Sequence, residues 1–88
     1  MRIRVFASYR EIVNEKYFNI EDVVVLRNVF EFMILKFDFG KKMEVNEFEL
    51  YNQSIVLING KNSKFLNGLD SIIEEDDDIA IFPIVCGG

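Results

Sequence analysis

The stretch of this 88-residue chain whose residue types could do chemistry is its last ten residues, Ile-Ala-Ile-Phe-Pro-Ile-Val-Cys-Gly-Gly. A strand-like apolar segment leads into Gly87 and Gly88, and glycine, which has no Cβ, fits narrow passages closed to other residues. A carboxylate on Gly88 has an ordinary pKa of about 3.3–3.7, so it is ionised and weakly nucleophilic at neutral pH. We expect this end of the chain to be its functional group. An accidental or truncated Gly-Gly end is the alternative.

Other catalytic groups are sparse in the sequence. There is no histidine, which removes the commonest general base and the commonest metal ligand. No glycine-rich phosphate loop is present. The single cysteine, Cys86, excludes an internal disulfide framework, a multi-cysteine metal site and a four-cysteine iron–sulfur cluster. The chain is therefore poorly equipped to be an enzyme on its own.

Composition and charge narrow the class of protein. Half of the residues are hydrophobic, including nine Phe and three Tyr, so residues 1–88 can form one domain with a packed core. The net charge is −5 and Lys and Arg are not clustered, which argues against a nucleic-acid partner. No apolar run is long enough to span a membrane, and residues 1–4 do not resemble a signal peptide. We expect a cytoplasmic protein.

Hydrophobic periodicity predicts the N-terminal elements. Residues 2–8 alternate, which places Ile3, Val5 and Ala7 on the core face and Phe6 on the opposite face. Residues 9–14 are expected to form a connecting turn, at most one helical turn. Residues 16–20 are expected to form a second strand in a hairpin with the first.

An amphipathic helix is predicted from about residue 24. Its apolar stripe has helical spacing, Asp22 is a candidate cap, and residues 38–41 are expected to end it. Phe32 and Leu35 lie off the stripe and are expected to pack under a neighbouring loop. The stripe consists of Leu26, Val29, Phe30, Met33 and Phe37.

The second half of the chain is predicted to be mainly strands. Residues 42–53 are expected to be irregular, with Phe48, Leu50 and Tyr51 in the core. A strand over 54–59 ends at the turn dipeptide Asn59-Gly60. After a short excursion, the acidic run 74–78 is interpreted as a solvated turn rather than a metal site, because runs of like charge usually face water.

This order of elements predicts an α+β fold of the β-grasp, or ubiquitin-like, class. A hairpin is followed by a helix that crosses one face of the sheet, and the last strand returns beside the first, so a mixed sheet packs on one main helix. We expect a flexible tail at about residues 84–88. Fold alone does not name a function.

The sequence resembles the MoaD/ThiS-type ubiquitin-like sulfur carriers, which include the small subunit of molybdopterin synthase and the archaeal ubiquitin-like small modifiers. The resemblance rests on residues 6–11 (Phe-Ala-Ser-Tyr-Arg-Glu), on 56–61 followed by 69–71, and on 77–88. The sequence departs from the family pattern at three positions. Asp76 replaces a turn glycine, Ile84 replaces a second proline, and Cys86 replaces a small residue.

The resemblance implies a reaction and partners. A separate E1-like enzyme would use ATP and Mg²⁺ to adenylate the Gly88 carboxylate, which would then accept sulfur as a thiocarboxylate for molybdenum or tungsten cofactor synthesis. Gly87 and Gly88 would thread a narrow channel in that enzyme. No cofactor would be bound stably by the chain itself, and the second partner would be the large subunit of molybdopterin synthase.

A docking surface is predicted from strand alternation. Phe6 and Phe82 both lie out of phase with the core residues, so in a β-grasp sheet they would form an exposed patch, joined by Leu66. By resemblance, this patch docks the large synthase subunit, with Arg10 and Pro83 contributing. The alternative is that a loop or another chain covers the two rings.

Other functions remain open at this stage. The chain is also interpretable as a ubiquitin-like modifier attached through Gly88 to target-protein lysines, or as a thiazole-synthesis carrier, although those chains are typically shorter across residues 36–53. A plain binding domain without tail chemistry is the residual alternative. We interpret the Cys86 thiol as incidental to the function. The alternatives are that it exchanges sulfur or forms an intermolecular disulfide.

Overall fold

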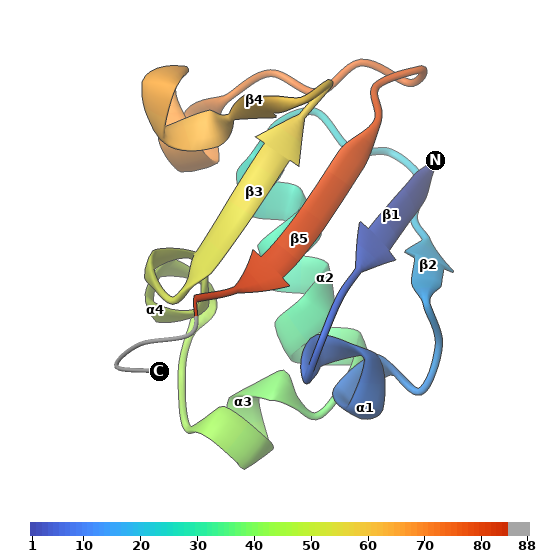
Figure 1. The fold of residues 1–88 in the computed structure, drawn as a ribbon, viewed down its shortest axis with the longest axis vertical. Helices are drawn as coiled ribbons and strands as arrows, with labels where there is room; N and C mark the ends of the chain where they lie inside the picture. The colour runs from blue at the N-terminus through green and yellow to red at the C-terminus, as the bar shows by residue number, and fades with distance from the viewer. Residues whose placement is uncertain (85–88) are drawn as a thin grey trace.

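The structure is a computed structural model that describes residues 1–84, and its centre is a five-stranded mixed sheet of order β2-β1-β5-β3-β4 (Figure 1). β1 pairs antiparallel with β2 and parallel with β5, and β3 pairs antiparallel with both β5 and β4. This is the predicted β-grasp arrangement. The strands are β1 (Arg2–Val5), β2 (Tyr17–Asn19), β3 (Ser54–Ile58), β4 (Lys61–Asn62) and β5 (Ile79–Pro83).

The main helix, α2, crosses behind the sheet in the view of Figure 1, so one sheet face is covered and the other is open. Short helices close the ends of the covered face. In residues 1–84 no helix combines the length and apolar character that spanning a bilayer requires. The helices are α1 (Tyr9–Val13), α2 (Leu26–Lys36), α3 (Phe39–Met43) and α4 (Glu47–Asn52), with 3₁₀ turns η1 (Ser63–Phe65) and η2 (Gly68–Asp70).

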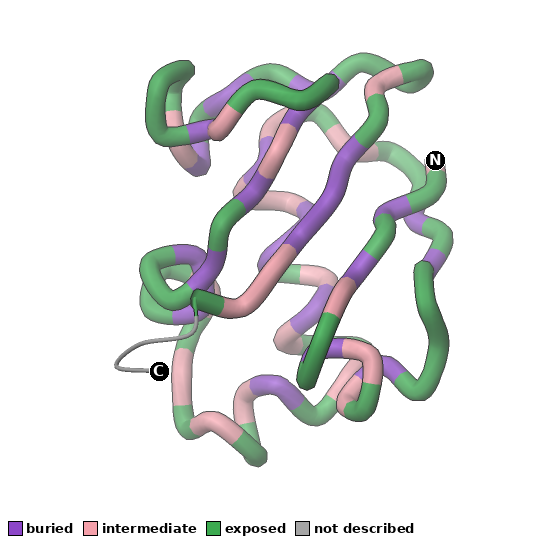
Figure 2. Tube along the Cα trace, in the orientation of Figure 1, coloured by how far each residue is buried: buried purple, intermediate pink, exposed green. Residues whose placement is uncertain are grey.

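The core lies between the sheet and α2. Ile3 and Val5 of β1 and Ile79 and Ile81 of β5 point inward and are fully buried, as alternation predicts. The stripe of α2 is fully buried at Leu26, Val29, Phe30 and Met33 and packs on these strands. Figure 2 shows the buried residues along β5 and on the side of α2 that faces the sheet.

Two N-terminal expectations are wrong. Ala7 is exposed, because β1 ends at Val5 and the chain turns at once into α1, with Ala7 at φ +53°. Asp22 does not cap α2. The helix begins after Val25, and the Asn28 side chain accepts hydrogen bonds from the amides of Val24 and Val25 at 3.0 Å, which satisfies donors before the first turn.

Residues 38–53 are more regular than expected. α2 ends at Lys36, but α3 begins two residues after Phe37, and α4 follows with a capping box between Asn46 and Glu49. Phe48 is 58% exposed, contrary to the prediction that it is in the core.

The other apolar residues of this region divide between core and solvent. Leu50 and Tyr51 are buried as predicted. Phe32 packs on Phe18 of β2, with ring centroids 5.6 Å apart, whereas Leu35 remains exposed.

The acidic run forms an exposed turn that is tied to neighbouring segments. Asp78 accepts two hydrogen bonds from the Arg4 guanidinium, at 2.8 and 3.2 Å. Asp77 accepts from the Asn59 side-chain amide and from the Glu74 amide. Asn59 and Gly60 form the expected turn between β3 and β4, both with positive φ.

Candidate functional site

Phe6 and Phe82 form a stacked pair on the open face of the sheet. The Phe6 amide donates to the Ile81 carbonyl at 3.2 Å, so the parallel pairing of β1 and β5 continues one residue beyond β1 and brings the two rings side by side. Their centroids are 4.2 Å apart and their planes differ by 9°. Both side chains are half-buried. We call Phe6 and Phe82 the aromatic pair, and their predicted proximity is observed.

Two arginines lie over the aromatic pair. The Arg10 guanidinium carbon is 4.8 Å from the Phe6 ring centroid, and its Nε donates to the Val5 carbonyl at 2.8 Å. Arg4 lies 5.7 Å from the same centroid while it pairs with Asp78. Cations above an aromatic face are attracted by the ring's quadrupole. The patch is therefore aromatic at its centre and cationic at its margin.

The cross-strand neighbour of Phe82 extends the patch. Ile55 of β3 pairs with Phe82 and is 37% exposed. Its place in the patch could not be predicted from the sequence, because residues 55–58 form a continuous apolar run and their alternation between buried and exposed positions appears only in the structure.

Leu66 does not adjoin the aromatic pair as predicted. It is 44% exposed, but it follows η1 on the β4 side. β4 pairs with Leu57 and Ile58, the end of β3 farther from Phe82, and Figure 1 shows η1 and η2 at the opposite end of the sheet from the end of β5.

The last described residues fix where the tail leaves the sheet. Pro83 pairs with Ser54, and the Ile84 amide donates to the Gln53 carbonyl at 2.9 Å. An open, mostly apolar hollow of about 300 Å³ lies beside them. It is lined by Tyr9, Met43, Asn52, Gln53, Pro83 and Ile84. Gly87 and Gly88, the predicted reactive residues, lie outside the described residues, as does Cys86.

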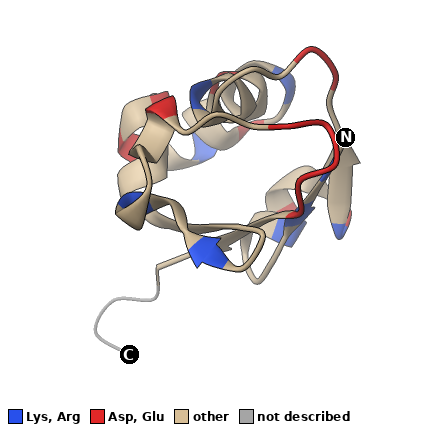
Figure 3. Ribbon diagram, turned by 90° about the horizontal axis from the view of Figure 1, so that it is seen from above, with Lys and Arg blue, Asp and Glu red and all other residues tan. Residues whose placement is uncertain are grey.

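Charge is unevenly spread around the open face. Three of the four arginines, Arg2, Arg4 and Arg10, lie in or next to β1, and Arg2 stacks on Tyr17 at 4.2 Å. Figure 3 shows Lys and Arg also on β4, whereas Asp and Glu mark the loop before α2 and the 74–78 turn, and α4 carries Glu47 and Glu49. An acidic protein thus presents basic side chains beside its aromatic pair.

The family model described as the ThiS family matches residues 3–88. The chain belongs to the ThiS family. It is 27% identical to small archaeal modifier protein 3 of Haloferax volcanii over 90 residues, which span 100% of this chain and 98% of that protein. These matches place it among the ubiquitin-like sulfur carriers and modifiers, as the sequence resemblance indicated.

Solved structures agree with this assignment. The small archaeal modifier protein 1 of Methanosarcina acetivorans is 26% identical, with a TM-score of 0.75 over 99% of this chain and 94% of that chain. A chain of the BexX/CysO complex of Amycolatopsis orientalis has a TM-score of 0.77 over 99% of this chain and 98% of that chain. At 20% identity, this second likeness supports the β-grasp fold alone.

In this ThiS-family chain the structure brings together four of the predicted partner-binding residues and separates one. Phe6, Arg10 and Phe82 form one surface, and Pro83 continues it toward the tail. Leu66 lies apart. Tyr9 lines the hollow beside Pro83 and Ile84, and the sequence did not indicate this because its contacts are with Gln53 and Ser54, 44 and 45 residues away.

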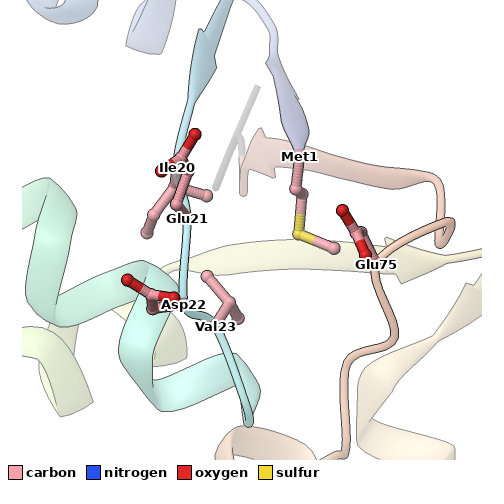
Figure 4. A pocket seen from close by; sticks show the side chains of 6 residues that line it. All are labelled: Met1, Ile20, Glu21, Asp22, Val23 and Glu75. Carbon is pink, nitrogen blue, oxygen red and sulfur yellow. The ribbon is translucent and has the colours of Figure 1, made fainter.

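A second hollow lies at the opposite end of the sheet from Pro83 and Ile84. It has a volume of about 390 Å³ and is lined by Met1, Ile20, Glu21, Asp22, Val23 and Glu75 (Figure 4). Three carboxylates border it. Within residues 1–84 no cluster of three or more His, Cys, Asp or Glu side chains has a metal-binding arrangement.

Proposed function

We propose that this ThiS-family protein is a sulfur carrier that acts as the small subunit of a molybdopterin synthase, with Gly88 as the residue that carries sulfur. One observation supports this most. The aromatic pair lies half-buried on the open face of the sheet, and β5, which carries Phe82, leads directly through Pro83 toward Gly87 and Gly88. A docked partner would therefore hold the chain within a few residues of its reactive end.

The proposed chemistry divides between two proteins. A carboxylate is a poor electrophile, so an oxygen of the Gly88 carboxylate would first attack the α-phosphorus of ATP and displace pyrophosphate, with Mg²⁺ held by the activating enzyme. Hydrosulfide would then attack the acyl carbon of the adenylate, displace AMP and release its proton. The product is a thiocarboxylate, in which one oxygen has been replaced by sulfur. The chain contributes the carboxylate and the docking surface, and the E1-like enzyme contributes the catalytic groups.

The docking surface is suited to an apolar partner surface edged with acidic groups. Aromatic residues are favoured anchors in interfaces, and the pair with Ile55 gives one contiguous apolar area on the open face. Arg10 uses its Nε to bond Val5, and its remaining N–H groups are oriented by the stack on Phe6. We infer that these N–H groups donate hydrogen bonds to a partner carboxylate, since guanidinium groups favour that pairing.

Intact-mass measurement tests the carrier function. The protein is incubated with ATP, Mg²⁺, an E1-like activating enzyme and a sulfide source, and a matched sample lacks only Gly88. We expect the full chain to gain the mass difference between sulfur and oxygen, and the shortened chain to remain unchanged. An unchanged mass of the full chain, with an enzyme shown to be active on another carrier, would overturn the proposal.

A second function has its own support. The 27% identity to small archaeal modifier protein 3 runs along the full chain, which favours a modifier joined through Gly88 to lysines of target proteins. Both functions share the adenylation step and diverge afterwards. Gly88-dependent, isopeptide-linked adducts in cells would indicate a modifier, whereas a stable complex with a large synthase subunit and transfer of sulfur to a pterin precursor would indicate the carrier.

A further inference from the structure

A chain of buried hydrogen bonds lies beneath the base of the tail. Tyr9 begins α1, three residues after Phe6, and its side chain is 1% exposed. Its hydroxyl lies 2.7 Å from Ser54 Oγ, and Ser54 Oγ donates to the Leu50 carbonyl at 2.7 Å. Because a serine hydroxyl has only one hydrogen, which here goes to Leu50, the Tyr9 hydroxyl donates to Ser54.

These hydrogen bonds hold the peptide to which the base of the tail is bonded. Gln53 lies between α4 and β3, and its carbonyl accepts the Ile84 amide at 2.9 Å and lies 3.4 Å from the Tyr9 hydroxyl. The next residue, Ser54, is held by Tyr9 and pairs with Pro83 in the sheet. The Tyr9–Ser54 bond therefore adds a side-chain contact to the backbone pairing that already holds the peptide between Gln53 and Ser54.

Burial keeps the Tyr9 hydroxyl protonated, so it can donate a hydrogen bond. Desolvation raises its pKa above the ordinary value for tyrosine, and the hydrogen bond with Ser54 opposes that shift only in part. The hydroxyl thus remains protonated across neutral and mildly alkaline pH.

We propose that Tyr9 is a positioning residue for the C-terminal tail: through Ser54 it holds the Gln53 carbonyl that binds the Ile84 amide, and so sets the direction in which the chain leaves the sheet toward Gly88. We call Tyr9, Ser54 and Gln53 the clamp. This inference rests on the proposed function, because the exit direction matters for a reaction only if Gly88 must reach a phosphate in a partner.

The clamp and the aromatic pair have separable roles. The pair holds the carrier on its partner, whereas the clamp aims the tail of a carrier that is already docked. Reacting atoms must approach to about 3–3.5 Å, and a small misplacement far from the chemistry is sufficient to slow the step. Loss of the clamp is therefore expected to lower kcat rather than raise KM.

The test compares two tyrosine-to-phenylalanine variants. Tyr9→Phe removes the clamp hydroxyl. Tyr51→Phe is the matched control, because the Tyr51 hydroxyl makes the same kind of buried bond, 2.8 Å from Ser63 Oγ, away from the tail. Each variant is measured by NMR amide hydrogen exchange at Ile84, and by kcat and KM for the carrier in ATP–pyrophosphate exchange catalysed by the activating enzyme.

We expect Tyr9→Phe to speed exchange at Ile84 and to lower kcat, each by about 2- to 10-fold, as the loss of one hydrogen bond predicts, with KM unchanged. Tyr51→Phe is expected to change neither. Ser54→Ala, which removes the acceptor, is expected to repeat both effects, so the test stands even if Tyr9→Phe fails to fold.

Unchanged Ile84 exchange in both clamp variants would overturn the inference, as would an equal effect of Tyr51→Phe. Faster exchange with an unaltered kcat would overturn the role of Tyr9 in the reaction. If the wild-type protein is not adenylated at all, the proposed function fails, and the exchange rates at Ile84, which need no enzyme, still decide whether the clamp exists.

Discussion

Replacing Phe82 with alanine separates docking from folding. The Phe6–Phe82 stack, at 4.2 Å and 9°, is of the kind worth about 0.5–1.5 kcal/mol beyond area burial. Loss of the stacking alone, about 1 kcal/mol, lowers the melting temperature of a domain this small by about 4–8 °C, and loss of the ring's buried area adds to this. The inward side chains of β5, Ile79 and Ile81, are untouched, so the variant should remain folded.

The effect on partner binding should be larger. Truncating a central aromatic anchor typically costs about 2 kcal/mol or more, which corresponds to a rise of about 30-fold in KM for the carrier. The value of kcat should stay unchanged, because Tyr9, Ser54 and Gln53 still hold the tail. Phe82→Ala is thus expected to raise KM at constant kcat, whereas Tyr9→Phe is expected to lower kcat at constant KM.

The assay combines thermal unfolding with steady-state adenylation at varied carrier concentration. Phe65→Ala is the matched control, since it removes the same ring from an 88% exposed position in η1. That control should change neither melting temperature nor KM appreciably. If Phe82→Ala lowers the melting temperature but leaves KM at the wild-type value, the aromatic pair is not the surface that docks on the activating enzyme.

Three further predictions follow from single positions. Gly60→Ala should cost about 1–2 kcal/mol in urea unfolding, because φ is +83° there while nothing lies within 4 Å of an added Cβ; a change near zero would contradict the backbone argument. The wild type should lose stability more steeply than Tyr9→Phe above the ordinary tyrosine pKa of 10.0, since the raised folded pKa of Tyr9 contributes stability that is complete below that pH and lost as pH rises through the folded pKa. Parallel unfolding free energies of these two proteins across that range would refute it. Gly87→Val should abolish adenylation and leave circular dichroism and melting temperature unchanged, because β5 ends at Pro83; normal adenylation of that variant would show that the tail needs no narrow passage.

Local periodicity was sufficient for the main elements. The alternation around Ile3 and Val5 and the 3.6-residue stripe through Leu26 and Met33 are properties of contiguous residues, and both are buried as expected. Predictions were wrong where a chain reversal interrupts a pattern. Ala7 continues the alternation of β1 in sequence, but the turn into α1 places it in solvent.

Helix α4 is a second element that local periodicity did not predict. Its capping box at Asn46 and Glu49 is a recognisable start signal, yet the segment is only six residues long and has too few turns for a clear stripe. Phe48 was therefore assigned to the core with Leu50 and Tyr51, although the helical spacing turns it toward solvent.

The sequence by itself determined which chemical groups this protein has to work with. It has no histidine and one cysteine, Gly87 and Gly88 shortly after an apolar strand, and two phenylalanines out of phase with the core. Only the tertiary structure decided which of these groups meet. The proximity of Phe6 and Phe82 was predictable once the β-grasp order was inferred, but the contact of Tyr9 with Ser54, which joins positions 45 residues apart, and the place of Leu66 at the far end of the sheet were not. The physical reason is that strand register and side-chain hydrogen bonds between distant segments are set by how the sheet closes over α2, and local periodicity contains no information about that closure.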